Sequence, residues 1–221
     1  MPDSSGPAGV LLDLDGTLVD TNYLHTLAWS RALRGAGEDA PMNAIHRLVG
    51  MGGDQLVPTL LGHECPDASA TRADRYRELS GEIRPLPGAS DLLAALHSAG
   101  LVVVIATSSP RDELKAPLAA LGEDAPIDLV TSADDVSSSK PDPEVFVEAM
   151  RSAGLDPGQT VAVGDSIWDV QAARAAGVGC IGVETGGFSR HELGEEGALH
   201  VYRDVQELAQ QLRTSPIGLL L

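Results

Sequence analysis

One stretch, Val10-Leu11-Leu12-Asp13-Leu14-Asp15-Gly16-Thr17, decides the fold of this 221-residue chain. The apolar run followed by Asp13 and Asp15 predicts a buried strand over residues 10–15 with two carboxylates at its end. Alternate side chains of a strand point to the same side, so we expect the two carboxylates to face the same way. Two such charges are costly to bury unless a cation meets them. The stretch therefore predicts either an ordinary acidic turn or a site for a hard cation such as Mg²⁺.

Apolar strand patterns and amphipathic helix patterns alternate along the rest of the chain, which is typical of a mainly parallel α/β sheet. Further strands are expected at residues 101–106, 128–131, 161–163, 179–183 and 201–202. Helices are expected after Pro110 and at residues 90–99, 143–153, 169–176 and 205–212, with a loop at residues 186–197. The sequence therefore predicts a Rossmann-like α/β core.

Residues 20–86, between the first two strands, show helical patterns and no convincing strand. The connection from a strand to the next element usually takes only a few residues, so an insertion of this size needs a purpose. We predict an α/β catalytic core, residues 1–19 and 87–221, with a helical cap, residues 20–86, inserted after the first strand. Such a cap would close over an active site and exclude bulk water, with residues 50–53 as the loop that approaches the substrate.

Charge and composition argue against several classes of partner. The formal net charge of −17 disfavours binding to nucleic-acid phosphates. No apolar run is long enough to cross a bilayer, and residues 1–6 lack the pattern of a secretion signal. Cys65 and Cys180 form neither a disulfide framework nor a metal-site pattern. We therefore expect a cytoplasmic protein, a monomer or weak dimer, without a nucleic-acid or membrane partner.

Four groups of polar residues are expected at one edge of the sheet, where the strands end and where α/β proteins bind ligands. They are Asp13 with Asp15, Thr107 with Ser108, Lys140 before Pro141, and Gly164-Asp165-Ser166 with Asp169. Each has a plain structural interpretation by itself: a cap for Thr107, a solvated turn for Lys140, a helix N-cap for Asp165 and first-turn helix charge for Asp169. The only other lysine is Lys115, so Lys140 has little competition as the cation of the site.

In order and spacing, these four groups resemble the motifs of the haloacid dehalogenase superfamily of phosphotransferases, over nearly the whole chain. The resemblance implies that Asp13 is the nucleophile that forms an aspartyl-phosphate and that Asp15 is the general acid and base. It also implies that Thr107, with the backbone N–H of Ser108, binds a phosphoryl oxygen. Lys140 would bridge the phosphoryl group and Asp13.

The same resemblance implies a Mg²⁺ cofactor. Its ligands from the protein would be the carboxylate of Asp13, the backbone carbonyl of Asp15 and the carboxylate of Asp165. Asp169 and Thr17 would support these ligands without touching the ion.

The inserted helices resemble the helical-cap branch that contains phosphoglycolate phosphatase and beta-phosphoglucomutase. His25, which follows Asp20-Thr21, matches the first cap helix of the mutase, and this implies that it helps to position Asp15 and contacts the substrate region; a purely structural histidine is the alternative. Gly53 is the second substrate-binding candidate of this segment, and it stands where the mutase has an arginine for a second phosphate. Arg72 and Arg75 are either cap cations or solvated residues.

We therefore expect a Mg²⁺-dependent phosphatase that hydrolyses a small phosphomonoester, with a phosphorylated metabolite as its partner. One alternative is a sugar-phosphate mutase of the beta-phosphoglucomutase kind, which Gly53 argues against. A second alternative is a phosphorelay receiver, which would have no use for the inserted helices. Dehalogenation is disfavoured because dehalogenating relatives lack the second aspartate, here Asp15.

Overall fold

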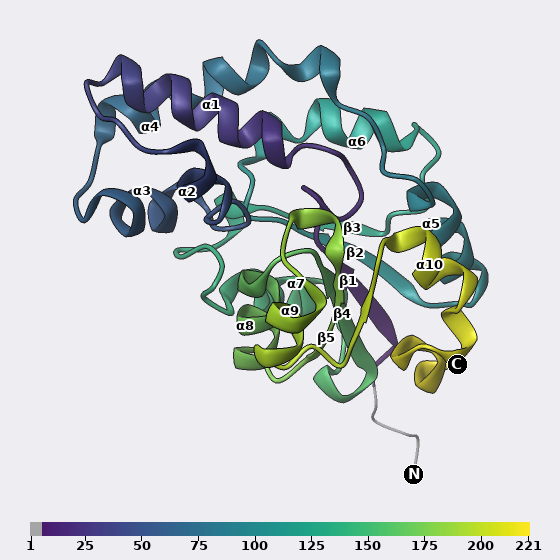
Figure 1. Cartoon of the computed structure of the whole chain (residues 1–221). Helices are drawn as coiled ribbons and strands as arrows, with labels where there is room; N and C mark the ends of the chain where they lie inside the picture. The colour runs from purple at the N-terminus through teal and green to yellow at the C-terminus, as the bar shows by residue number, and fades with distance from the viewer. Residues whose placement is uncertain (1–5) are drawn as a thin grey trace.

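The computed structural model describes residues 6–221 (Figure 1). Residues 1–5 lie outside the described residues. They are part of the predicted core segment 1–19 and of residues 1–6, the stretch considered for a secretion signal. Six strands form one parallel sheet in the order β3-β2-β1-β4-β5-β6. Their bounds are β1 Gly9–Leu12, β2 Val102–Ala106, β3 Leu129–Thr131, β4 Thr160–Gly164, β5 Gly179–Val183 and β6 His200–Tyr202. The predicted mainly parallel α/β fold is confirmed.

The register of the sheet places the ends of its central strands at one level. Leu12 of β1 pairs with Ile105 of β2 on one side and with Val163 of β4 on the other. The strand order reverses between β1 and β4, and ligands of open α/β sheets bind in the crevice at such a reversal. The residues that follow β1, β2 and β4 therefore meet at this crevice.

Helices cover both faces of the sheet, which explains the uniformly apolar strands. In β1, Val10 and Leu12 face one apolar cluster, and Leu11 faces another. The first cluster includes α5 Ala89–Ser98, α6 Lys115–Leu121 and α10 Val205–Gln210, and the second includes α7 Glu144–Ala153, α8 Ile167–Ala175 and α9 Arg190–Glu195. No helix within residues 6–221 combines the length and hydropathy that crossing a bilayer requires.

Five helices lie between β1 and β2 in the chain, and the first four of them gather beyond one end of the sheet (Figure 1). These four are α1 Asn22–Gly35, α2 Met42–His46, α3 Gly53–Leu61 and α4 Pro66–Arg77. They share an apolar cluster of their own, which includes Trp29, Leu33 and Leu56. The two connections to the core run side by side, since the N–H of Asp20 donates to the carbonyl of Arg84 at 2.9 Å.

Two predictions from the sequence were wrong in detail. The first strand ends at Leu12, so Asp13 to Asp15 follow the strand and do not belong to it. Residues 186–197 are not a plain loop, because they contain α9. The side chain of Ser189 accepts the N–H of Glu192 and the side chain of Glu192 accepts the N–H of Ser189, which is a capping box that starts this helix.

Candidate active site

A cavity of about 500 Å³ lies where the central strands end and α1 to α4 face the core. The core contributes Asp13, Asp15, Thr107 and Ser108 to its lining. The helical segment contributes His25, Trp29, Gly53 and Arg72, among others. Parts of the chain that are far apart in sequence therefore enclose one space.

Asp13 lies at the bottom of this space, against a fully buried lysine. The Nζ of Lys140 donates to Asp13 Oδ1 at 2.6 Å and to the carbonyl of Ala106 at 2.8 Å, and it lies 2.8 Å from Asp169 Oδ1. Burial opposes the charge of Lys140, but attraction to Asp13 and Asp169 outweighs it and raises the pKa of Lys140 above its usual value. The lysine therefore stays charged and the sequence-based idea of a solvated turn lysine is wrong, since none of its surface is exposed.

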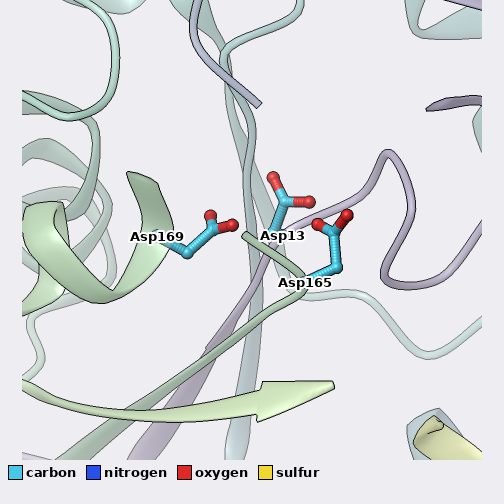
Figure 2. Close-up of side chains that lie close together, drawn as sticks. All are labelled: Asp13, Asp165 and Asp169. Atoms are coloured by element: carbon cyan, nitrogen blue, oxygen red, sulfur yellow. The ribbon is translucent and has the colours of Figure 1, made fainter. Parts of the chain in front are cut away.

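Asp13, Asp165 and Asp169 gather around a common space, where one oxygen of each lies within 4.8 Å of the others (Figure 2). Burial, followed by repulsion from the other carboxylates, raises the pKa of Asp165; burial also raises the pKa of Asp13 against the attraction of Lys140. One lysine thus does not balance three carboxylates. An all-oxygen set with excess negative charge fits a hard divalent cation.

The hydrogen bonds of the cluster separate its members. Asp169 Oδ2 accepts both the N–H and the hydroxyl of Ser166, and Asp169 Oδ1 faces Lys140, so both of its oxygens are engaged. Asp165 Oδ1 accepts the hydroxyl of Thr17 at 3.2 Å and Oδ2 accepts the amide of Asn22 at 2.8 Å. These donors fix the orientation of Asp165.

Asp15 has different surroundings from Asp13. Its carboxylate accepts hydrogen bonds from Thr21 Oγ1 at 2.7 Å, His25 Nε2 at 2.9 Å and Ser109 Oγ at 2.7 Å, and Thr107 Oγ1 lies 3.4 Å away. Burial acts to raise the pKa of Asp15, but the hydrogen bonds from His25, Thr21 and Ser109 hold the pKa well below its usual range. This arrangement holds Asp15 in its basic, ionised form.

A chain of contacts behind His25 fixes its tautomer. Arg72 contacts both His25 Nδ1 and the carboxylate of Glu113. A guanidinium only donates, so Nδ1 must accept, and the ring proton lies on Nε2, which donates to Asp15. The side chains of Arg72 and Glu113 are 11% and 5% exposed, which places this ion pair inside the protein.

The structure also places the remaining candidate residues, Thr107, Ser108, Gly53 and Arg75. Thr107 is buried and its hydroxyl accepts the N–H of Ser109 at 3.0 Å, while Ser108 Oγ is buried without a hydrogen-bond partner among the described residues. Gly53 lines the cavity, and a Cβ added to it would lie 3.0 Å from Trp29. Arg75 pairs with Glu78 on the exposed surface, so it is the solvated residue of the two arginines left open by the sequence.

Sequence reasoning missed four residues of this site. Glu113, Asn22, Thr21 and Ser109 all bond to predicted site residues or to Arg72. Thr21 and Ser109 lie next to motifs already recognised, so proximity to those motifs was the available signal. Asn22 follows Thr21 directly and had the same signal, although its partner Asp165 lies 143 residues away. Glu113 had no such signal, because its partner Arg72 lies 41 residues away.

Comparison with known proteins agrees with this geometry. A family model described as haloacid dehalogenase-like hydrolase matches residues 7–177. A phosphoglycolate phosphatase of Rhodospirillum rubrum is 36% identical, over 93% of this chain and 91% of that protein. A validoxylamine A 7'-phosphate phosphatase of Streptomyces hygroscopicus is 30% identical, over 79% of this chain and 84% of that protein. The crystal structure of a hydrolase from Pseudomonas syringae is 35% identical with a TM-score of 0.89, covering 94% of this chain and 98% of that one.

Buried acids and a lysine thus lie where the strand order of the parallel sheet reverses. The family model matches most of the chain, and the relatives are phosphatases. The chain belongs to the haloacid dehalogenase-like hydrolases and is a phosphoric monoester hydrolase.

Proposed function

We propose that the protein hydrolyses a small phosphomonoester with Mg²⁺ through an aspartyl-phosphate on Asp13. The observation that supports this most is the position of Asp13, which lies at the bottom of the cavity with its carboxylate against Lys140 and beside Asp165. A carboxylate held there can attack phosphorus, while the lysine offsets the negative charge that gathers on the phosphoryl oxygens.

In the first step an oxygen of Asp13 forms a bond to phosphorus as the bond to the ester oxygen breaks. Asp15, which its surroundings hold ionised, must first take up a proton from solvent, and it gives that proton to the departing alkoxide. In the second step the ionised Asp15 takes a proton from water, and the oxygen of that water displaces Asp13 from phosphorus. Inorganic phosphate leaves and Asp13 is regenerated. The basic form in which the surrounding donors hold Asp15 matches the second step.

Mg²⁺ would be held by the carboxylates of Asp13 and Asp165 and the backbone carbonyl of Asp15. It would supply positive charge to the phosphoryl oxygens during transfer. Asp169 would hold Lys140 in place, and Thr17 would orient Asp165. Thr107 and the backbone N–H of Ser108 would bind phosphoryl oxygens.

Residues 20–86 would act as a cap on the core formed by residues 1–19 and 87–221. Contacts between the two parts support the placement of the cap on the core. The N–H of Ser139 donates to Asp54 at 3.1 Å, and the indole N–H of Trp168 donates to the carbonyl of Arg47 at 3.3 Å. A phosphatase is favoured over a mutase, because Gly53 lies against Trp29 and supplies no cation. The receiver alternative is not favoured, because the matching family is one of hydrolases. A cytoplasmic location and a monomer or weak dimer stay predictions.

The test is phosphate release from a panel of phosphomonoesters, with and without Mg²⁺, by wild-type protein, Asp13→Asn and Asp91→Asn. Asp91 is exposed on α5 and serves as the matched control. We expect release only with Mg²⁺, loss of turnover in Asp13→Asn and normal turnover in Asp91→Asn. Mass spectrometry of acid-quenched wild-type protein should find phosphate on the peptide that contains Asp13. Full activity of Asp13→Asn would overturn the proposal.

A further inference from the structure

Apart from Asp13 and Asp15, the residues that line the cavity wall carry an excess of negative charge. Asp54, Glu64, Asp112 and Glu113 line it. Arg72 is the only arginine or lysine in the lining, within the part of the chain that the structure describes. The group attached to the substrate's phosphate must therefore fit a wall with four carboxylates and one guanidinium.

That one guanidinium is already engaged. Arg72 pairs with Glu113 and donates to His25, and both partners of the ion pair are almost fully buried. If a second anionic group of a substrate bound Arg72, it would have to displace Glu113 and leave that carboxylate buried without its partner. Asp54 and Glu64 have no ion-pair partner within residues 6–221, and Asp112 has only Arg77 at 3.9 Å on the exposed surface. A carboxylate or second phosphate would thus meet like charge.

Hydroxyl groups, in contrast, would find partners on this wall. Carboxylates accept hydrogen bonds from hydroxyls, and Ser69, Ser108 and Ser137 also reach the lining. Ser108 Oγ is buried and unpartnered within the described residues, so it has a bond still to make. Apolar side chains such as Trp29 and Met51 complete the lining and suit the carbon skeleton of a sugar.

The size of the cavity favours the same kind of ligand. Pockets that bind small organic ligands usually measure about 300–1,000 Å³, and this cavity of about 500 Å³ lies within that range. A phosphorylated two-carbon acid would leave much of this space to water, whereas a sugar monophosphate would fill more of it.

Resting on the proposed phosphatase activity, we propose that the substrate is a sugar or polyol monophosphate whose alcohol part is uncharged and polyhydroxylated, called a neutral ester. We propose further that the Arg72–Glu113 pair selects against substrates with a second anionic group. Glu113 is the specificity-determining residue in this scheme. It keeps Arg72 from binding the carboxylate or phosphate of a competing ester.

The experiment compares kcat/KM for neutral sugar and polyol monophosphates, phosphoglycolate and fructose 1,6-bisphosphate. We expect the best neutral ester to exceed phosphoglycolate and the bisphosphate by about tenfold or more, since like-charge contact is penalised even where solvent screens it. If phosphoglycolate or the bisphosphate is the best substrate, the inference is overturned while the phosphatase activity stands. If no ester, including p-nitrophenyl phosphate, is hydrolysed in a manner that depends on Asp13, the proposed function itself fails.

Glu113→Gln tests the selecting pair. It removes the charge that engages Arg72 while keeping the size of the side chain, so we expect the ratio of kcat/KM for phosphoglycolate to that for the best neutral ester to rise by about tenfold. This ratio does not depend on how much of the preparation is correctly folded, because both substrates are measured on the same sample. Glu148→Gln is the matched control, because Glu148 pairs with Arg151 on the exposed face of α7 outside the cavity. A ratio in Glu113→Gln equal to that in Glu148→Gln would overturn the role of the pair.

Discussion

Replacement of Arg47 by methionine tests whether the helical segment is held closed by a contact away from the substrate cavity. Arg47 follows α2, and its guanidinium lies 3.9 Å from the ring centre of Phe188 and 2.6 Å from the carboxylate of Glu192. The ion pair is exposed by about two fifths, so we assign it about 0.5 kcal/mol, and the contact with the aromatic ring about 0.5–1 kcal/mol. The sum, about 1–1.5 kcal/mol, corresponds to a shift of about five- to twelvefold between closed and open forms.

Trp168 of α8 reports on this contact, because its indole N–H donates to the carbonyl of Arg47. In a Trp29→Phe background Trp168 is the only tryptophan, so its emission follows opening of the helical segment. We expect Arg47→Met to shift the Trp168 emission toward that of an exposed indole and to weaken the apparent affinity for inorganic phosphate by up to about tenfold. Arg31→Met is the matched control, because Arg31 pairs with Glu78 within the helical segment. If both variants give the same emission and phosphate affinity, Arg47 does not hold the segment closed.

The same contact has a defined pH dependence. The N–H of Ser189, its hydroxyl and Arg47 lower the pKa of Glu192 from 4.5 to about 2. A carboxyl with a lowered pKa in the folded protein stabilises it above the pKa of the unfolded chain, and this contribution disappears as the pH falls through the folded pKa. We therefore expect the difference in stability between wild type and Glu192→Gln to be constant above about pH 5 and to shrink between pH 4.5 and 2 in thermal unfolding. A difference that grows over this range would contradict the assignment.

Two further changes act on the site itself. Lys140→Ala leaves the buried acids without their cation and should lower kcat by about 10²–10³-fold, measured by phosphate release; a loss of less than about tenfold would contradict its electrostatic role. Gly52→Ala places a Cβ 2.3 Å from the hydroxyl of Ser139, so we expect lower kcat/KM from incomplete closure, whereas Gly81→Ala, with open space around its added Cβ, should behave as wild type. Equal kcat/KM in the two glycine variants would show that the approach of Gly52 to Ser139 does not limit closure.

The grouping of the four motifs could be predicted because a parallel sheet has few ways to arrange its strand ends. Once β1, β2 and β4 are adjacent, the residues that follow them must meet. Asp13 lines the cavity together with Thr107 and clusters with Asp165. The existence of the strands followed from their apolar runs. The end of β1 could not be predicted in this way, because the buried apolar residues continue to Leu14, whereas the strand itself stops at Leu12.

The Arg72–Glu113 pair could not be predicted, for a physical reason. Arg72 lies on the otherwise polar helix α4, and Glu113 lies in the short turn after Pro110, so neither breaks a local pattern. Their pairing depends on how the helical segment sits on the core, which no spacing in the sequence encodes. The start of α9, in contrast, could have been predicted from the sequence. Ser189 and Glu192 are three residues apart, which is the spacing of a capping box.

Residues at the beginning of α1 bond to two carboxylates of the proposed site, Asp15 and Asp165. Thr21 and His25 donate to Asp15, and Asn22 donates to Asp165, so three donors within five residues contact the proposed acid–base group and a proposed metal ligand. Any motion of α1 must therefore loosen both carboxylates at once. It follows that displacement of the helical segment would change the orientation of Asp15 and of Asp165 together, which couples access to the cavity with readiness for phosphoryl transfer.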